Sequence, residues 1–417
     1  AGNDVTAQFK VTKKSGKLTI KKRQVTLRSS DAKKEYDGTA LTKDEVKVTS
    51  GSFADKEGYT ATTSGSQTLV GTSANKFNYE LNKGTKAANY EIKTVNGTLE
   101  VTAVTDEHKH EAVVQAPSNE DTYDGTEKSA GTELTGTTFP WKGQTYRIEG
   151  LTSANVTKTD AGEYENKVNG TAKVLDTAGN DVTAQFKVTK KSGKLVINPK
   201  EYTVTTDSAT KTYSGTALTA GGKVEGIVSG ETVEFTTTGS QTEVGTSKNT
   251  YELVWKSAKA TNYTLVKESI GTLTVKAKSI VPDGPDTPDE KKTGITVSEP
   301  SDSKYDGKEH KEVLTVTDTK TGKELVAGTD YSVTYSSDLV NAGTVKVTVA
   351  GLGNYTGSFT KTYKITKRSV TLTSATVSKV YDGSALTNTS ITVSGDGFVE
   401  GEGASYEVTG TQTEVRN

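Results

Sequence analysis

Residues suited to metal binding gather in two short stretches of this 417-residue sequence. Glu107-His-Lys-His-Glu111 has two histidines separated by one residue, which would place both imidazoles on one face of a strand. A zinc site needs a third and usually a fourth ligand, and the only other histidine is His310. Asp283, Asp286 and Asp289 could offer oxygens to calcium, but intervening prolines prevent that loop from wrapping around an ion. We therefore predict a solvated charged segment and a linker, with no bound metal.

Groups that could carry out catalysis are scarce. The sequence has no cysteine and only three histidines, which nearly excludes nucleophilic triads. Gly351-Leu-Gly353 lacks the strand-to-helix setting of a phosphate loop, so we interpret it as a turn. Paired carboxylates remain open, although nothing in the sequence places two of them in one cleft. We expect no enzymatic activity and no cofactor.

Charge and composition limit the partners that this chain can have. The 51 basic and 52 acidic residues are interspersed, which argues against nucleic acid as a partner. No apolar run approaches the roughly 20 residues that span a bilayer, so we expect no membrane insertion. Only 31% of residues are hydrophobic, which fits several small β-modules better than one large core.

An internal repeat organises the chain. Residues 178–197 repeat residues 1–20 with one difference, Val196 in place of Thr19. A near-identical copy at a fixed offset indicates an array of duplicated units. A finer repeat is a Tyr-Asp-Gly-like turn that recurs every 76 to 92 residues: Tyr36-Asp-Gly38, Tyr123-Asp-Gly125, Tyr213-Ser-Gly215, Tyr305-Asp-Gly307 and Tyr381-Asp-Gly383. Each is interpreted as a tight turn after a strand.

Between these turns the hydrophobic period is two. Tyr331, Val333 and Tyr335 share one strand face, and Val345, Val347 and Val349 alternate with polar residues. Such alternation predicts half-buried antiparallel strands, and no window shows a helical stripe. We predict an all-β chain, a tandem array of small antiparallel β-sandwich (immunoglobulin-like) domains, with β-grasp-like modules as the alternative.

The modules are of three types, which we call A, B and C. Short connections such as Leu18–Leu27 favour a monomeric extended rod over a compact cluster. The prolines of 277–291 predict a semi-rigid spacer. The expected order is a type-B tail (1–20), a first A module (21–102), the B module (103–198), a second A module (199–276), the linker (277–291), the C module (292–366) and a truncated last A module (367–417).

The Tyr-Asp-Gly…Gly-Thr…Asn-Tyr pattern resembles the MBG-type and bacterial immunoglobulin-like repeats of large Gram-positive surface adhesins. The closest stretch is Tyr305-Asp-Gly-Lys…Asn341-Ala-Gly-Thr344…Gly353-Asn-Tyr-Thr-Gly357. The resemblance implies secretion, an extracellular cell-surface location with cell-wall anchoring, and a role in host attachment. No export signal or Leu-Pro-x-Thr-Gly sorting motif is present, so we expect an internal fragment anchored through other parts. The family has no shared catalytic residues.

Surface proteins of this kind sometimes contain a Lys–Asn or Lys–Asp isopeptide bond. Lys34, Lys211 and Lys379 each lie two residues before a module tyrosine, and Asn89 and Asn262 recur as well. The other interpretation is that these lysines lie at the sheet edge and discourage edge-to-edge pairing. Each bond would remove one ammonia, so intact mass decides between the two.

Aromatic residues specific to the B module mark a candidate binding loop. Phe139-Pro-Trp-Lys-Gly143 occurs in the B module, with Tyr146 close by. If exposed, Phe139, Trp141 and Tyr146 could anchor a partner. The other interpretation is that they are core residues.

Two functions from different classes follow. In the first, the chain is the internal stalk of a large bacterial adhesin, projecting an adhesive tip and contributing to host attachment. In the second, the B module itself captures a host glycoprotein, mucin, glycan or immunoglobulin, and duplication adds avidity. An exposed aromatic patch within residues 139–150 would favour the second.

Overall fold

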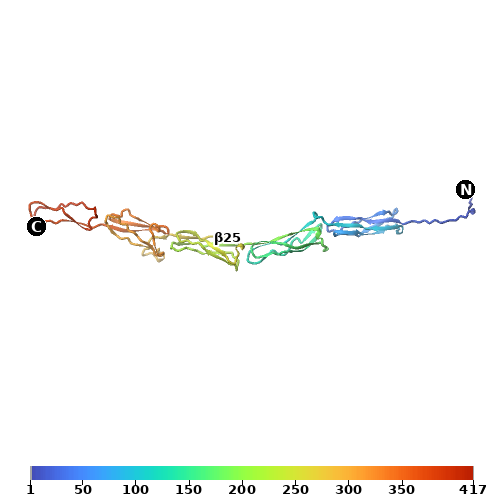
Figure 1. Ribbon diagram of the computed structural model, residues 1–417, viewed down its shortest axis with the longest axis horizontal. Helices are drawn as coiled ribbons and strands as arrows, with labels where there is room; N and C mark the ends of the chain where they lie inside the picture. Colours follow the sequence, from blue (N-terminus) through green and yellow to red (C-terminus); the bar gives the residue numbers. More distant parts are fainter. Residues whose placement is uncertain (1, 417) are drawn as a thin grey trace. The chain divides into compact units, whose positions relative to one another are not determined.

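The computed structural model describes residues 2–416, which form β-strands joined by turns and loops (Figure 1). This confirms the all-β prediction. A β-grasp module would need an α-helix packed on its sheet, and the described residues form none. Their only helices are short 3-10 turns, none long or apolar enough to cross a membrane: η1 Thr6–Gln8, η2 Ala87–Asn89, η3 Thr183–Gln185, η4 Ala260–Asn262 and η5 Asp289–Lys291.

The chain divides into two compact units, one ending at Lys200 and the other beginning at Glu201. In the first unit, the first A module contains three sheets, ordered β3-β1-β7, β2-β8-β5 and β4-β6. Its core lies around Val25, Leu27 and Tyr90. The strands are β1 Arg23–Ser29, β2 Ala32–Glu35, β3 Val46–Gly51, β4 Tyr59–Thr63, β5 Gly71–Asn75, β6 Phe77–Leu81, β7 Tyr90–Val95 and β8 Gly97–Thr102.

The first and last strands of this module are parallel neighbours, which the antiparallel prediction missed. Strand β1 pairs with β7 from Arg23↔Tyr90 to Arg28↔Val95, and β2 pairs with β8 from Ala32↔Leu99 to Glu35↔Thr102. The first two strands, β1 and β2, thus belong to two different sheets. Period-two alternation shows which residues are half-buried but carries no information on strand direction.

The B module repeats this plan. Parallel pairing joins β9 to β17 and β10 to β18, and further sheets have the orders β12-β13-β16 and β11-β14. Its strands are β9 His110–Gln115, β10 Asn119–Thr122, β11 Lys128–Ser129, β12 Thr138–Trp141, β13 Gln144–Ser153, β14 Thr157–Lys158, β15 Gly162–Asn166, β16 Val168–Leu175, β17 Phe186–Lys191 and β18 Gly193–Asn198.

The second unit begins with the second A module, whose three sheets have the same layout as in the first: β21-β19-β25, β20-β26-β23 and β22-β24. Figure 1 labels β25. The strands are β19 Lys200–Thr206, β20 Ala209–Thr212, β21 Gly222–Glu225, β22 Val233–Thr237, β23 Gly245–Lys248, β24 Tyr251–Trp255, β25 Tyr263–Ser269 and β26 Thr272–Lys276. The same strand pairing recurs because the two A modules share their sequence motifs.

The C module is centred on the sheet β29-β35-β33-β32, with β28-β30-β31 as a second sheet. Val345, Val347 and Val349 are buried along β33, as their alternation predicted. The strands are β27 Lys278–Ser279, β28 Ile295–Val297, β29 Ser303–Lys304, β30 Val316–Asp318, β31 Lys323–Glu324, β32 Tyr331–Tyr335, β33 Gly343–Gly351, β34 Tyr355–Thr356 and β35 Ser358–Thr366.

The structure places the start of the predicted 277–291 linker inside the C module. Strand β27 pairs with β34, and Ile280 is fully buried. Asp283 accepts hydrogen bonds from the backbone N–H groups of Thr293 and Gly294, both at 2.7 Å. Proline content indicated a spacer, but the buried Lys278 and Ile280 side chains fix its first residues to the module.

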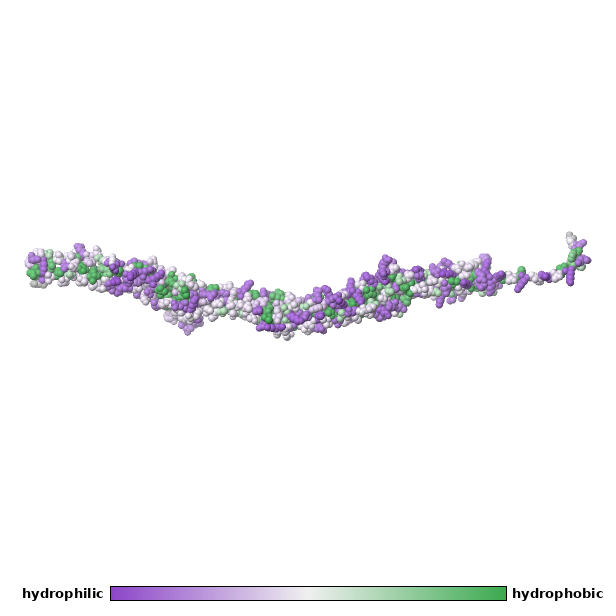
Figure 2. Space-filling model, in the orientation of Figure 1, coloured by the Kyte–Doolittle hydropathy of each residue, from purple (hydrophilic) through white to green (hydrophobic). Residues whose placement is uncertain are grey.

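The last A module contains two short sheets, β36-β38 and β37-β39. Their strands are β36 Val370–Ser374, β37 Leu386–Thr387, β38 Ile391–Gly395 and β39 Thr411–Gln412. Up to residue 416 the copy has no counterpart of β7 or β8, and Leu372 and Val393 are partly exposed. On the face seen in Figure 2, hydrophobic residues form small patches separated by hydrophilic ones.

Candidate functional site

The recurring Tyr-Asp-Gly turns are held by local hydrogen bonds. In the first A module, Asp37 Oδ1 accepts from the Thr39 N–H at 2.9 Å and from its hydroxyl at 2.7 Å. Asp124, Asp306 and Asp382 each accept from the backbone N–H two residues on, at 2.9 Å. Gly38 has φ of +79°, a conformation that glycine adopts without steric cost. The turn is therefore preorganised by its own residues.

The three lysines predicted as isopeptide candidates contact these turns. Lys34, Lys211 and Lys379 each donate to the hydroxyl five positions later, on Thr39, Thr216 and Ser384, at 2.7, 3.0 and 2.6 Å. Lys34 and Lys379 also meet the turn carboxylates of Asp37 and Asp382, at 2.8 and 2.9 Å. The second A module has Ser214 there, so a Lys–Asp amide has no carboxyl group in that copy. All three copies share a lysine that holds the turn by a hydrogen bond to the hydroxyl five positions later, and we call this contact the Lys clamp.

The Lys clamp lowers the pKa of the turn carboxylates. A hydrogen bond from Lys379, reinforced by Ser384, lowers the pKa of Asp382 to about 2. Burial acts to raise the pKa of Asp37, but hydrogen bonds from Lys34 and Thr39 outweigh it and the pKa is lowered. Both turns therefore carry a negative charge at neutral pH.

The tyrosine of the first turn is part of the core of the B module. Tyr36 is 1% exposed and packs in one cluster with Val104, Tyr146 and Phe186. Its ring stacks on Trp141 with centroids 6.2 Å apart. Burial raises the pKa of both Tyr36 and Tyr146, so both hydroxyls stay neutral. We call this contact the A–B joint.

The segment considered as an aromatic binding loop lies in this joint, where its rings pack as core residues, the second of the two interpretations. Phe139 and Tyr146 are 8% and 1% exposed, and Trp141 is partly buried. Phe139 stacks on Tyr146 at 5.6 Å, and Trp141 meets Phe186 edge-on at 5.1 Å. These rings fill the core and bind Tyr36, so two of the three present little surface to a partner.

The glycine of the turn also belongs to the joint. A Cβ atom on Gly38 would lie 2.1 Å from the Tyr146 hydroxyl, so the close approach requires glycine. Glu35 accepts from the Thr105 N–H at 3.0 Å and lies 3.3 Å from His108 Nδ1. Apolar packing and hydrogen bonds therefore act together in the A–B joint.

A second joint, the A–C joint, is built from the same turn of the second A module. Tyr213 is 8% exposed and shares the core of the C module, where its ring meets Tyr355 edge-on at 5.7 Å. A Cβ atom on Gly215 would lie 3.3 Å from the Thr321 methyl group. Asn354 accepts from the Val244 N–H at 2.9 Å, which ties the Asn-Tyr landmark to the preceding module.

A buried ion pair lies behind the A–C joint. Lys278 Nζ is 2.6 Å from Asp318 Oδ1, and the two side chains are 7% and 0% exposed. Tyr355 donates its hydroxyl to the other carboxylate oxygen at 3.1 Å. Burial acts to raise the pKa of Asp318, but Lys278 outweighs it and the pKa is lowered. Each buried charge therefore has the other as its partner, as a buried charge must have.

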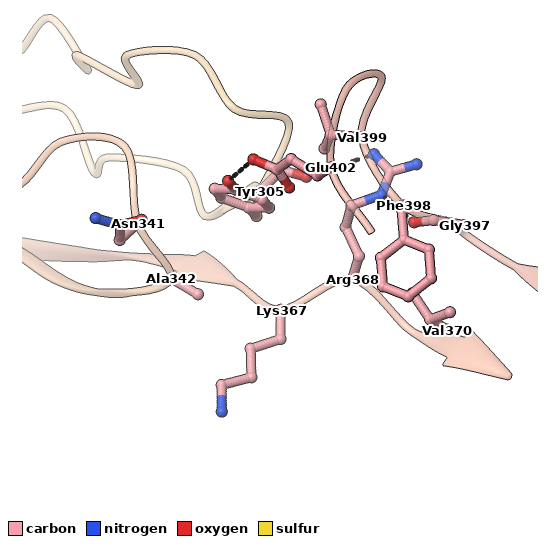
Figure 3. Close-up of a pocket in the computed structure, with 10 residues that line it drawn as sticks. All are labelled: Tyr305, Asn341, Ala342, Lys367, Arg368, Val370, Gly397, Phe398, Val399 and Glu402. Carbon is pink, nitrogen blue, oxygen red and sulfur yellow. Dashed lines mark hydrogen bonds between the residues drawn. The ribbon is translucent and has the colours of Figure 1, made fainter. Parts of the chain in front are cut away.

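The C–A joint connects the turn of the C module, Tyr305-Asp-Gly307, to the last A module (Figure 3). Tyr305 donates its hydroxyl to Glu402, and Arg368 donates to the carbonyls of Tyr305 and Gly397. A Cβ atom on Gly307 would lie 3.2 Å from Val399. A cavity of about 330 Å³ lies beside these residues. This joint is more polar than the other two.

The turn of the last A module has the same Lys clamp but no docked module among the described residues. Tyr381 is 57% exposed, against 1% for Tyr36 and 8% for Tyr213. A Cβ atom on Gly383 would meet nothing within 4 Å. The turn and its Lys clamp are therefore present even where no module docks on them.

The residues first considered as metal ligands are placed apart from one another. His108 lies beside Glu35, whereas the His110 ring stacks on Phe139 at 5.4 Å. His310 contacts Asp306 at 2.8 Å. Between residues 2 and 416, no three His, Cys, Asp or Glu side chains are placed to hold a metal ion.

Several buried polar residues in the modules next to the joints were not predicted from the sequence. The buried Lys278 and Asp318 lie 40 positions apart, and neither belongs to a recurring motif. Gln185, whose side chain accepts from the Val104 N–H at 2.9 Å, is buried within a polar stretch. The recurrence of the turn glycine was the feature of the sequence that pointed to the joints. It indicates that another part of the chain approaches the turn closely, but it does not identify that part.

No family model and no curated protein matches this chain. Solved structures that match it include immunoglobulin domains 1–5 of Sidekick-1, with 11% identity, coverage of 82% of this chain and 81% of that one, and a TM-score of 0.24. Drosophila N-cadherin EC1–4 has 11% identity, coverage of 85% and 94%, and a TM-score of 0.19. Protocadherin Gamma B2 cadherin domains 3–6 has 10% identity, coverage of 84% and 98%, and a TM-score of 0.27. Similarity at this level carries no argument about function.

Proposed function

We propose that this chain is an internal stalk of a large bacterial cell-surface adhesin, outside the cell, which projects a binding tip and so contributes to host attachment. The observation that carries the proposal is the joint. The turn tyrosines Tyr36 and Tyr213 are buried in the core of the module that follows. Modules that share side chains in this way are coupled to their neighbours, as a stalk requires.

Repetition of one joint chemistry with different partners supports the same function. The type-A turn docks on an aromatic cluster in the B module and on Tyr355 in the C module. The turn keeps its Lys clamp in both places. A chain built in this way can be lengthened by duplication without a new contact having to evolve, which fits the near-identical copies in its sequence.

The alternative, in which the B module captures a host glycoprotein, mucin, glycan or immunoglobulin, loses its main support. It depended on an exposed aromatic patch within residues 139–150, and Phe139 and Tyr146 are buried. Our proposal therefore gives this chain the role of a stalk and not that of the segment that captures a host molecule.

Small-angle X-ray scattering of the full chain tests the proposal. A compact 417-residue protein would have a radius of gyration of about 22 Å. We expect a value several times larger, together with a narrow, rod-like cross-section. A value near the compact one would contradict the stalk. Saturable binding of the chain to immobilised mucin or immunoglobulin that is lost in Trp141→Ala would favour ligand capture instead.

A further inference from the structure

The first and last strands of a module lie side by side and run in the same direction. In the first A module, Arg23 at the start of β1 is opposite Tyr90 at the start of β7. At the other end, Glu35 of β2 is opposite Thr102 at the end of β8. The chain therefore enters at one end of this strand pair and leaves at the other.

This register determines how a pulling force acts on the module. Tension on the two chain ends draws β1 and β2 toward Arg23, and β7 and β8 toward Thr102. Parallel neighbours pulled in this way slide along each other, so all their hydrogen bonds are loaded together. In an antiparallel pair opened from one end, by contrast, the bonds are loaded one after another.

Buried side chains add to the resistance. Val25 and Leu27 on β1 are 2% and 0% exposed, and Leu99 and Val101 on β8 are 0% and 1% exposed. Sliding of the strands would have to draw these side chains out of close-packed surroundings. Resistance to sliding is therefore built into both the backbone and the core.

We propose that these parallel terminal strands form a mechanical clamp, the strand clamp, that keeps the modules containing them folded under tension. The B module has the same arrangement, with β9 along β17 over His110–Gln115 and β10 along β18 over Asn119–Thr122. In the second A module, β20 runs parallel to β26 over Ala209–Thr212. The inference goes beyond a stalk role, because it concerns the strength of a module whatever the chain is attached to.

Pulling on the module in two different directions tests the strand clamp without any change to the fold. The chain has no cysteine, so a pair of introduced cysteines provides unique attachment points in the full chain. Lys22, Thr72 and Ala103 are exposed. The variant Lys22→Cys/Ala103→Cys loads the strand clamp along its strands. The variant Thr72→Cys/Ala103→Cys opens β5 from β8 at the Gly71↔Val101 end.

Single-molecule force spectroscopy on both variants gives the unfolding force of the same module in two directions. We expect the force through positions 22 and 103 to exceed that through 72 and 103 by about twofold or more, because hydrogen bonds loaded together share the force. Equal forces, or a lower force through 22 and 103, would overturn the proposal. Thermal unfolding of both variants without load should be the same, which shows that direction and not stability sets the difference.

Discussion

Two glycines of the same motif differ only in what lies next to them. Gly38 and Gly383 have φ of +79° and +75°, so alanine should strain the backbone at both by about 1–2 kcal/mol. Only at Gly38 would the new methyl group meet the Tyr146 hydroxyl. We expect Gly38→Ala to lower the free energy of unfolding by about 1–3 kcal/mol more than Gly383→Ala. Urea unfolding of the full chain measures this, and equal losses would show that the A–B joint does not depend on the close approach.

The buried pair of Lys278 and Asp318 allows a charge prediction. Lys278→Met leaves an uncompensated carboxylate in a fully buried position, which should cost about 3–5 kcal/mol. The double variant Lys278→Met/Asp318→Leu removes both charges and should recover most of that loss. Urea unfolding of the wild type, both single variants and the double variant gives the coupling energy. Additive losses would contradict a specific pair.

The same pair has a predictable dependence on pH. The pKa of Asp318 is lowered in the folded state, whereas an unfolded aspartate has a pKa of about 3.9. The carboxylate therefore stabilises the fold fully above that pH, and the contribution is lost as pH falls through the folded pKa. We expect the acid loss of stability to be shallower in Lys278→Met/Asp318→Leu than in the wild type. Thermal unfolding between pH 2 and 6 measures it, and parallel pH curves would contradict the assignment.

At the scale of the element, two nearly identical segments have different structures. Leu195 and Ile197 of β18 are 0% and 1% exposed, whereas their equivalents Leu18 and Ile20 are both 99% exposed. Strand β18 is held between β10 and β15, whereas no strand among residues 2–416 pairs with residues 9–20. The local hydrogen bond from the Thr N–H to the Asp side chain is present in both, at Asp4 and at Asp181. Local contacts thus follow from the sequence, but strands require partners.

Hydrogen exchange provides a test in which the sequence itself is the control. Residues 9–20 and 186–197 have nearly the same intrinsic exchange rates, because they differ only at Thr19 and Val196. We expect amides of 186–197 to exchange more slowly by a factor of about 1,000 or more, since opening them requires about 5 kcal/mol of unfolding. Mass spectrometry of the two peptides measures the ratio. Similar protection would show that residues 9–20 find a strand partner in solution.

The difference between local contacts, which follow from the sequence, and strands, which require partners, also explains which features of the joints the sequence predicted. The turn, its glycine and the alternating strands follow from local patterns, and the structure contains them. Parallel pairing of the outer strands did not follow, because side-chain alternation is the same in both directions. The burial of Phe139 and Tyr146 was open as well, since an aromatic residue in a variable segment can belong to a binding loop or to a core. That choice depends on Tyr36, more than 100 positions away.

At the scale of the whole molecule, a shared core has consequences for how the chain unfolds. Tyr36 and Val101 of the first A module belong to the same buried cluster as Phe186 and Val174 of the B module. Unfolding of one module would expose apolar surface on the other, which costs free energy in proportion to the area. The two modules of the first unit should therefore unfold together, although each has its own sheets.

Differential scanning calorimetry of the full chain tests this coupling. Tyr36→Ala removes the ring that joins the two modules, with an expected loss of about 3–5 kcal/mol at a buried aromatic position. We expect the transition of the first unit to divide into two, with calorimetric and van't Hoff enthalpies that agree only for each part. The matched control is Tyr381→Ala, which alters the same motif where the ring is 57% exposed and should leave the number of transitions unchanged. An undivided transition in Tyr36→Ala would mean that the modules remain coupled through the hydrogen bond from the Thr105 N–H to Glu35 instead, which Glu35→Ala would then interrupt.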